Sequence, residues 1–353
     1  MNQTRHEFTL RAAVVLGAGL AICAGPASAR DLTVVSWGGT FQDAQREIFF
    51  KPYAAETGKP LLDESWDGGY GVVQAKVKAG QPNWDVVQVE SEELALGCAD
   101  GIYEKLDWDK LGGMDSYIPG AATECGAGDI VWSVAIAYDG NRLTDGGPEN
   151  WADFWDVEKF PGKRSRRKGA KYALEAALMA DGVSMHDVYD VLSSPEGVDR
   201  AFAKLDELRP HLVWWEAGAQ PLSFLQTGDV VMASVYNGRI TGLNRAEGTN
   251  LKVVWNESMY AVDSWVILKG AENKDAGLDF IAWSQQPERT SRLPEYVAYG
   301  MTVKAAVDMV PEELAVDLPT WPANLEVSIP LNIEYWVDNS EELTERFNAW
   351  VAQ

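Results

Sequence analysis

Aromatic and charged side chains follow two apolar runs that are expected to form strands. Trp37 comes directly after residues 32–36, and Glu90 comes directly after residues 84–89. An aromatic face can hold an apolar stem or a cation, and a carboxylate can pair with an ammonium. Ligands of open α/β sheets bind just beyond the carboxyl ends of strands. Trp37 and Glu90 are therefore candidate binding residues.

The same pattern recurs in the second half of the chain. Tyr236 ends the apolar run 230–236, Arg239 follows it closely, and Asp263 precedes a strand expected to begin at Trp265. For any one residue, a core ring or a solvated charge is the more common role. Their coincidence at strand ends favours a binding site, in which a guanidinium would suit a carboxylate or phosphate. Other tryptophans are assigned to core packing: Trp132, Trp151, Trp155 and Trp283.

Catalytic motifs give little support for an enzyme. The sequence has no G-x-S-x-G, H-E-x-x-H or P-loop pattern. Glu216, after Trp214 and Trp215, could be the acid of a sugar-cleaving cleft, but a glycosidase needs a second placed carboxylate. An exported hydrolase using Glu216 is the alternative to a binding protein. A scaffold is disfavoured because the chain has no internal repeats.

The N-terminus predicts export. Arg5 and Arg11 precede an apolar run, 12–24, that is too short to span a bilayer, and small residues occupy 27–29. This pattern is typical of a signal peptide over residues 1–29, with cleavage near Ala29. We therefore expect a periplasmic protein.

The composition disfavours a nucleic-acid partner. Lys and Arg number 30 against 53 Asp and Glu, which gives a net charge of −23. This charge suits a cationic solute, although a soluble acidic surface would produce the same balance. We expect no cofactor and no metal ion.

Two cysteines, Cys98 and Cys125, lie beyond the signal peptide. In an oxidising compartment such a pair is expected to form a disulfide, worth about 3–4 kcal/mol in the chain-entropy model. Free thiols are the alternative. Cys23 falls within the signal peptide, and Ile22 is a poor residue to precede a lipidated cysteine, so a lipid anchor is disfavoured.

Alternating strands and helices predict an α/β protein with a parallel sheet in two lobes. The first helix is expected to start at the N-cap Thr40, to be kinked or shortened by Pro52 and to stop at Gly58. Asn339 is expected to cap the last helix. The basic run 163–168 is expected to be a solvated loop, with a partner-docking patch as the alternative.

Several motifs carry a resemblance to a known family. They include residues 35–41, 84–87, 213–216, 236–240 and 299–300. With these motifs the chain resembles the periplasmic substrate-binding proteins of bacterial ABC importers, in the spermidine/putrescine-binding branch. The resemblance covers essentially the whole mature chain.

The resemblance implies a type II periplasmic-binding-protein fold with two hinge crossings and a ligand cleft between the lobes. Lobe 1 would comprise residues 30–137 plus 262–308, and lobe 2 residues 138–261 plus 309–353. The protein would be a monomer that captures a small amine-bearing solute by hinge closure. It would deliver the solute to an ABC permease in the inner membrane.

The resemblance also implies roles for individual residues. Trp37 would be an aromatic wall and Asp263 an acidic partner for an amine. Tyr236 stands in the place of a tryptophan wall, Tyr299 in that of a ligand-contacting tyrosine, and Glu90 close to a polar contact.

One position departs from the polyamine binders, which typically carry an aspartate where this chain has Arg239. A cation facing a second ammonium would be costly in a dry cleft. We therefore expect a ligand with an amine at one end and an acid at the other, such as the ω-amino acid 4-aminobutyrate. Asp263 or Glu90 would hold the amine, and Arg239 the acid. Whether Glu175 or Gln220 reaches the cleft is left open.

Overall fold

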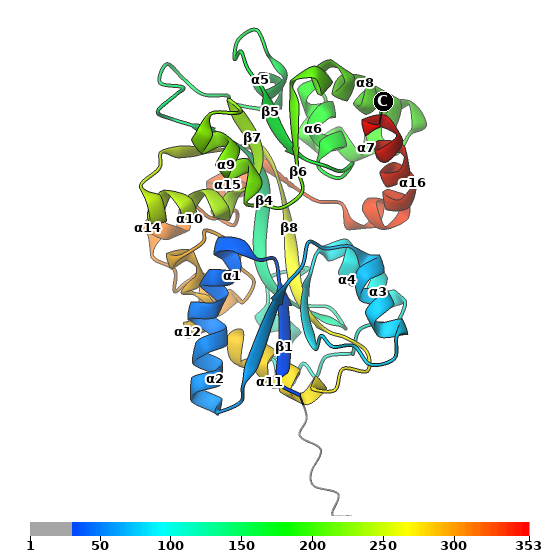
Figure 1. Ribbon diagram of the computed structural model, residues 1–353, viewed down its shortest axis with the longest axis vertical. Coiled ribbons are helices and arrows are strands. Elements are labelled where there is room, and N and C mark those ends of the chain that lie inside the picture. The colour runs from blue at the N-terminus through cyan, green and yellow to red at the C-terminus, as the bar shows by residue number, and fades with distance from the viewer. Residues whose placement is uncertain (1–29, 353) are drawn as a thin grey trace, which may run out of the picture.

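The computed structural model describes residues 30–352 and arranges them as two α/β halves stacked along the long axis of the molecule (Figure 1). Two long strands, β4 (Gly126–Asp139) and β8 (Leu251–Ile267), run through both halves. The predicted signal peptide lies outside the described residues. Among the described residues, no helix is both long enough and apolar enough to cross a bilayer.

The lower half in Figure 1 is built on three strands, β1 (Leu32–Ser36), β2 (Leu61–Ser65) and β3 (Val86–Val89). Its helices are α1 (Gly39–Gln45), α2 (Lys51–Thr57), α3 (Tyr70–Lys78), α4 (Ser91–Ala99), α11 (Lys274–Ser284) and α12 (Pro287–Thr290).

The upper half is built on β5 (Arg164–Arg167), β6 (Leu212–Trp215) and β7 (Met232–Tyr236). Its helices are α5 (Trp151–Trp155), α6 (Ala173–Ala180), α7 (Val188–Leu192), α8 (Pro195–Leu208), α9 (Gln220–Thr227), α10 (Asn237–Glu247) and α16 (Ile333–Val351). The segment before α16 contains β9 (Gly300–Met301), α13 (Lys304–Val307), α14 (Glu312–Ala315), α15 (Pro322–Glu326) and β10 (Ser328–Pro330).

The strands of both halves join into one mixed sheet. Its order is β2-β1-β3-β8-β4-β7-β5-β6, with β9 added to β4 and β10 to β8. β1 is parallel to β2 and β3, and β5 is parallel to β6 and β7, as the alternation predicted. The prediction of a parallel sheet is wrong for the centre, because β8 is antiparallel to β3 and β4, and β4 to β7.

The first helical segment keeps its predicted apolar face but not its predicted cap. Phe41 and Phe49 are buried, whereas Thr40 lies inside α1, which begins after Gly38 at a φ of 64°. A π-helical turn, Arg46–Phe50, continues the segment into α2. Pro52 lies just after this π-helical turn and does not end the helical segment, which runs to Thr57 with the left-handed Gly58 as its C-cap.

Two further boundaries differ from the expectations. β8 starts at Leu251, so Asp263 lies inside a strand and not before one. α16 starts at Ile333, because the side chain of Asn332 accepts a hydrogen bond from the Tyr335 amide at 3.0 Å. Asn339, the predicted cap, is therefore inside the helix.

The basic run 163–168 is not a solvated loop. Arg164–Arg167 form strand β5, and Arg164 and Arg166 are buried. Arg164 donates hydrogen bonds to the main-chain oxygens of Phe154, Asp156 and Gly162. These carbonyls replace the water that a buried guanidinium loses.

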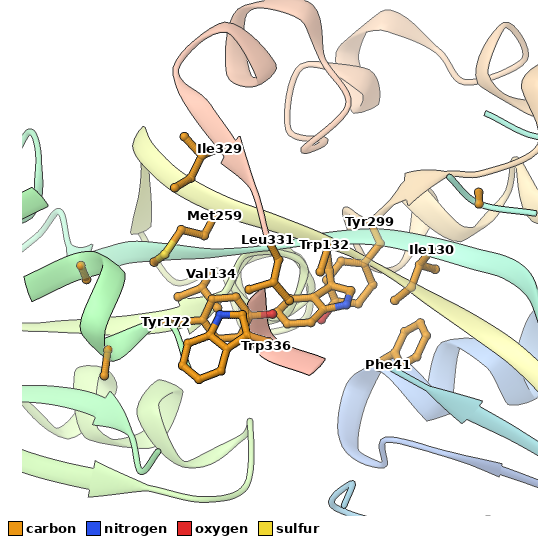
Figure 2. Close-up of a cluster of buried hydrophobic side chains, with 14 of the residues drawn as sticks. Phe41, Ile130, Trp132, Val134, Tyr172, Met259, Tyr299, Ile329, Leu331 and Trp336 are labelled. Atoms are coloured by element: carbon orange, nitrogen blue, oxygen red, sulfur yellow. The ribbon is translucent and has the colours of Figure 1, made fainter. Parts of the chain in front are cut away.

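The core is continuous through the centre of the molecule. Figure 2 shows part of its largest cluster, in which Tyr172 and Trp336 lie at one end and Phe41 at the other, with Trp132 and Tyr299 between them. A smaller cluster in the lower half contains the disulfide Cys98–Cys125, which confirms the predicted pairing. Trp151 and Trp155 are buried as expected, and Trp283 is half-buried.

Candidate ligand-binding cleft

A cavity holding about 490 Å³ of space lies between the two halves. The six residues expected to form the site all line it: Trp37, Glu90, Tyr236, Arg239, Asp263 and Tyr299. They come from the residue after β1, the residue before α4, the end of β7, the first turn of α10, the last third of β8 and the residue before β9. The sheet therefore brings residues far apart in the sequence to one place.

Aromatic rings form two walls of the cavity. Trp37 stacks on Trp66, with ring centres 5.2 Å apart and planes inclined by 15°. Tyr236 is held edge-on by Trp132 at 5.0 Å and by Trp215 at 5.2 Å. Trp132 was assigned to core packing alone. That assignment is incomplete, because the ring is buried in the core and also lines the cavity.

Asp263 supplies a buried carboxyl group. Its side chain is 3% exposed, and Oδ1 accepts a hydrogen bond from Nε1 of Trp132 at 2.6 Å. Burial, followed by the negative charge of Glu90, raises the pKa of Asp263 well above its usual value. A cation placed beside this carboxyl would offset both effects.

Arg239 supplies a buried guanidinium to the same cavity. It is 5% exposed, and its Nη2 donates a hydrogen bond to the main-chain oxygen of Trp37 at 3.2 Å. Among residues 30–352, its buried Nε has no hydrogen-bond partner. Gly218 makes room for this group, since a Cβ there would lie 2.8 Å from Nε. The guanidinium thus has unused donor capacity beside the cavity.

Tyr299 and Phe41 close the floor near Arg239. Their rings meet edge to face at 5.2 Å, and Tyr299 is 4% exposed. Burial raises the pKa of Tyr299, so its hydroxyl stays protonated at neutral pH. It can therefore act as a hydrogen-bond donor as well as an acceptor.

Glu90 lines the cavity but is already paired. Its Oε1 accepts from Arg167 Nη1 at 3.2 Å, and its Oε2 accepts from Lys171. Burial alone would raise the pKa of Glu90, but the charges of Lys171 and Arg167 outweigh it and lower the pKa to about 2. Of the two carboxylates expected to hold an amine, Asp263 is the one without a cationic partner in the described structure.

Other residues of the cavity were not foreseen as binding residues. Trp66 and Arg167 both line it. Trp66 follows β2, which was not recognised as a strand because most of its side chains are exposed. Arg167 belongs to the basic run that was interpreted as a loop. Their positions directly after β2 and at the end of β5 would have identified them if those strands had been recognised.

Three acidic or amide side chains left open by the sequence have other roles. Glu216 lies at the rim, is exposed and pairs with Lys168 at 3.1 Å. Glu175 is fully buried, where its Oε1 accepts hydrogen bonds from Trp336 and Tyr189. Gln220 accepts from the Glu216 and Ala217 amides at the start of α9. Glu175 and Gln220 do not line the cavity.

The fold and the cleft match known proteins. Residues 62–323 match the family of bacterial extracellular solute-binding proteins. The chain is 46% identical over 336 residues to a gamma-aminobutyric acid-binding protein of Pseudomonas aeruginosa, covering 95% of each chain. It is 22% identical over 280 residues to the spermidine/putrescine-binding periplasmic protein of Escherichia coli, covering 76% of this chain and 78% of that one.

A solved structure shows the same architecture. The periplasmic binding protein MotA of A. tumefaciens, in complex with glucopine, superimposes with a TM-score of 0.85 at 29% identity. The match covers 91% of this chain and 100% of MotA.

These findings define the class of the protein as a type II periplasmic binding protein. The chain belongs to the bacterial extracellular solute-binding protein family, and it is a solute-binding protein of an ABC transporter. The predicted resemblance to this family is confirmed, with the polyamine-binding proteins as more distant relatives. The hydrolase alternative finds no support among the relatives.

Proposed function

We propose that this protein is a non-catalytic receptor for a small ω-amino acid, with 4-aminobutyrate as the leading candidate. One observation carries the proposal: Arg239 and Asp263, which are opposite in charge and both more than nine-tenths buried, line the same cavity. A buried charge is tolerated when it is paired. A zwitterion would supply one partner for each of them.

The chemistry of each end supports this assignment. The carboxylate of the ligand would take the unused donors of Arg239, in a charge-assisted hydrogen bond. Its ammonium would pair with Asp263, and its apolar stem would lie against the rings of Trp37 and Tyr236. The hydroxyl of Tyr299 would add a donor for the carboxylate.

The relatives are named for ligands that all carry an amine, and these ligands differ in the group at their other end. The Pseudomonas relative is named for gamma-aminobutyric acid, and the more distant one for spermidine and putrescine. A diamine would place its second ammonium in a cavity that already holds Arg239. Like charges in a desolvated site repel strongly, so this cavity suits the amino acid better.

The mechanism that we propose is hinge closure. Arg239 lies on α10 of the upper half, whereas Trp37 and Glu90 belong to the lower half, and Asp263 directly precedes the β8 residues that pair with β3. A ligand that touches both sets of residues favours the closed form over the open one.

The lobes would be residues 30–137 plus 262–308 and residues 138–261 plus 309–353, moving about β4 and β8. The protein would work as a periplasmic monomer after removal of residues 1–29 and deliver its ligand to an inner-membrane permease.

A thermal-shift screen of the mature protein with ω-amino acids, polyamines and sugars tests the proposal. We expect a rise in melting temperature of several degrees with 4-aminobutyrate, which chromatography should recover unchanged. A shift with sugars alone, or conversion of any ligand that is lost in Glu216→Gln, would instead support the hydrolase. Native mass spectrometry of the freshly purified protein would identify any ligand carried through purification.

A further inference from the structure

An ion-pair cluster joins the two halves beside the cleft. Glu90 and Glu92 lie at the start of α4 in the lower half, and Arg167 and Lys171 lie at and after the end of β5 in the upper half. Lys171 Nζ pairs with both carboxylates, and Arg167 pairs with Glu90 at 3.2 Å. The cluster therefore exists only when the halves are together.

The cluster is largely withdrawn from solvent. The side chains of Glu90 and Glu92 are 9% and 12% exposed, and that of Lys171 is 17% exposed. Burial raises the pKa of Glu92, whereas the two cations keep Glu90 ionised. Glu90 is thus the carboxylate that pairs with both cations, whereas Glu92 pairs with Lys171.

Both oxygens of Glu90 are occupied by these cations, Oε1 by Arg167 and Oε2 by Lys171. Glu90 also lines two cavities: the cleft and a neighbouring space of about 1030 Å³ that contains Lys171. Glu90 is therefore accessible from the cleft, whereas Lys171 lines the neighbouring space and not the cleft.

We propose that Lys171 is a specificity-determining residue whose ammonium neutralises Glu90 and so makes the cleft less attractive to a ligand with two cationic ends. The cleft is thereby limited to ligands with a single cationic end. This proposal rests on the proposed function, and it assigns the rejection of diamines to Lys171 together with Arg239.

Lys171 affects the balance of charge in the cleft through Glu90. Without Lys171, Oε2 of Glu90 loses its cationic partner and the potential of the cleft becomes more negative. A more negative cleft attracts a diamine more strongly, and it repels the carboxylate of a zwitterion. The affinity for putrescine relative to 4-aminobutyrate should therefore rise. A merely structural contact between the halves would instead change both affinities by the same factor.

Calorimetric titration of Lys171→Met with putrescine and with 4-aminobutyrate tests this inference. We expect the ratio of the two dissociation constants to shift at least about tenfold toward putrescine, the factor that corresponds to about 1.4 kcal/mol. Lys171→Arg keeps the charge and should retain the wild-type ratio. Lys163→Met removes an exposed charge of the upper half and serves as the matched control.

The outcomes separate this inference from the proposed function. An unchanged ratio in Lys171→Met would overturn the inference, and so would weaker binding of 4-aminobutyrate with no detectable binding of putrescine. If the wild-type protein binds no ω-amino acid, the proposed function fails. Circular dichroism and melting curves of each variant check that the protein is folded.

Discussion

The guanidinium of Arg239, on α10, donates a hydrogen bond to the main-chain oxygen of Trp37, at the end of β1, across a distance of 3.2 Å. This bond joins the upper half of the molecule to the lower half beside the cavity. The remaining donors of the same guanidinium are the strongest candidates for a ligand carboxylate. Arg239 would thus take part both in closure of the cleft and in recognition of one ligand end.

Replacing Arg239 by Met tests its role in carboxylate recognition. Truncating one partner of a buried, hydrogen-bonded charge pair costs about 2–5 kcal/mol, so 4-aminobutyrate should bind at least about 30-fold more weakly. The ligand-free melting temperature should change little, because Arg239 makes one side-chain hydrogen bond within the described structure. Calorimetry measures the affinity. Arg142→Met, which removes an exposed arginine of the upper half, is the control. Affinities of the two variants for 4-aminobutyrate within threefold of each other would refute the role of Arg239 in carboxylate recognition.

Asp263 should release a proton when an amine binds. Its pKa is raised by burial, so the ligand-free cleft holds the carboxyl group protonated to higher pH than usual. A bound ammonium favours the ionised form and lowers this pKa. The affinity for 4-aminobutyrate should therefore increase with pH until the ligand-free group is itself ionised.

Titrations in buffers of different ionisation enthalpy, between about pH 5 and pH 8, count the protons released. Asp263→Asn should abolish the release and weaken binding at least about tenfold, since a charge-assisted bond becomes a neutral one. Asp308→Asn, at an exposed position, should behave as the wild type. The same proton count in Asp263→Asn as in the wild type would assign the release to another group.

The strands that the sequence revealed are those that are buried on both faces. Leu32–Ser36 has Leu32, Val34 and Val35 close together, and all five of its residues are buried. The first part of β8 was not predicted because exposed polar side chains such as Lys252 and Asn256 interrupt its apolar pattern. Its pairing with β4 is a tertiary interaction that no local pattern records. β5 was mistaken for a loop because nothing local shows that main-chain carbonyls stabilise Arg164 and Arg166 in a buried position.

The site could be predicted where a strand end was visible. Trp37 and Tyr236 end strands that the sequence outlines, so the rule for open sheets identified them. Trp132 lies in the middle of β4, and its exposure to the cavity depends on a neighbour, Asp263, that is brought beside it by the β4–β8 pairing. The pairing of Glu90 with Lys171 likewise depends on how the two halves meet.

Asp129 should make the stability of the protein depend on pH. The group is fully buried, and although Gln285 and Gln88 donate to it, burial raises its pKa to about 7. The folded state then binds a proton more tightly than the unfolded state does. This proton therefore contributes to the free energy of unfolding. Its contribution is complete below the pKa of Asp129 in the unfolded chain, about 4, and is lost as the pH rises toward 7.

The variant Asp129→Asn should flatten this part of the pH profile. Urea unfolding between about pH 4 and pH 8 measures it, and the loss attributable to Asp129 is at most about 4 kcal/mol. Glu93, whose pKa burial raises to about 7, contributes with the same sign and should leave a residual slope. A slope in the variant as steep as in the wild type would exclude Asp129 as a source.

The disulfide should stabilise the fold without affecting recognition. Cys98 and Cys125 are 27 residues apart, and a loop of this size is worth about 3–4 kcal/mol in the chain-entropy model. The pair belongs to a core cluster of the lower half and does not line the cleft. Cys98→Ser/Cys125→Ser should therefore unfold at lower urea concentration and bind 4-aminobutyrate with unchanged affinity. A large loss of affinity in the folded variant would contradict this separation.

The central claim is that a buried cation and a buried carboxyl group hold the two ends of one zwitterion. Calorimetric titration of the wild-type protein with 4-aminobutyrate and, separately, with putrescine tests this claim most directly. The account predicts saturable binding of 4-aminobutyrate at a single site, with putrescine weaker by at least about 100-fold, or about 2.7 kcal/mol. Tight binding of putrescine together with no binding of 4-aminobutyrate would contradict it.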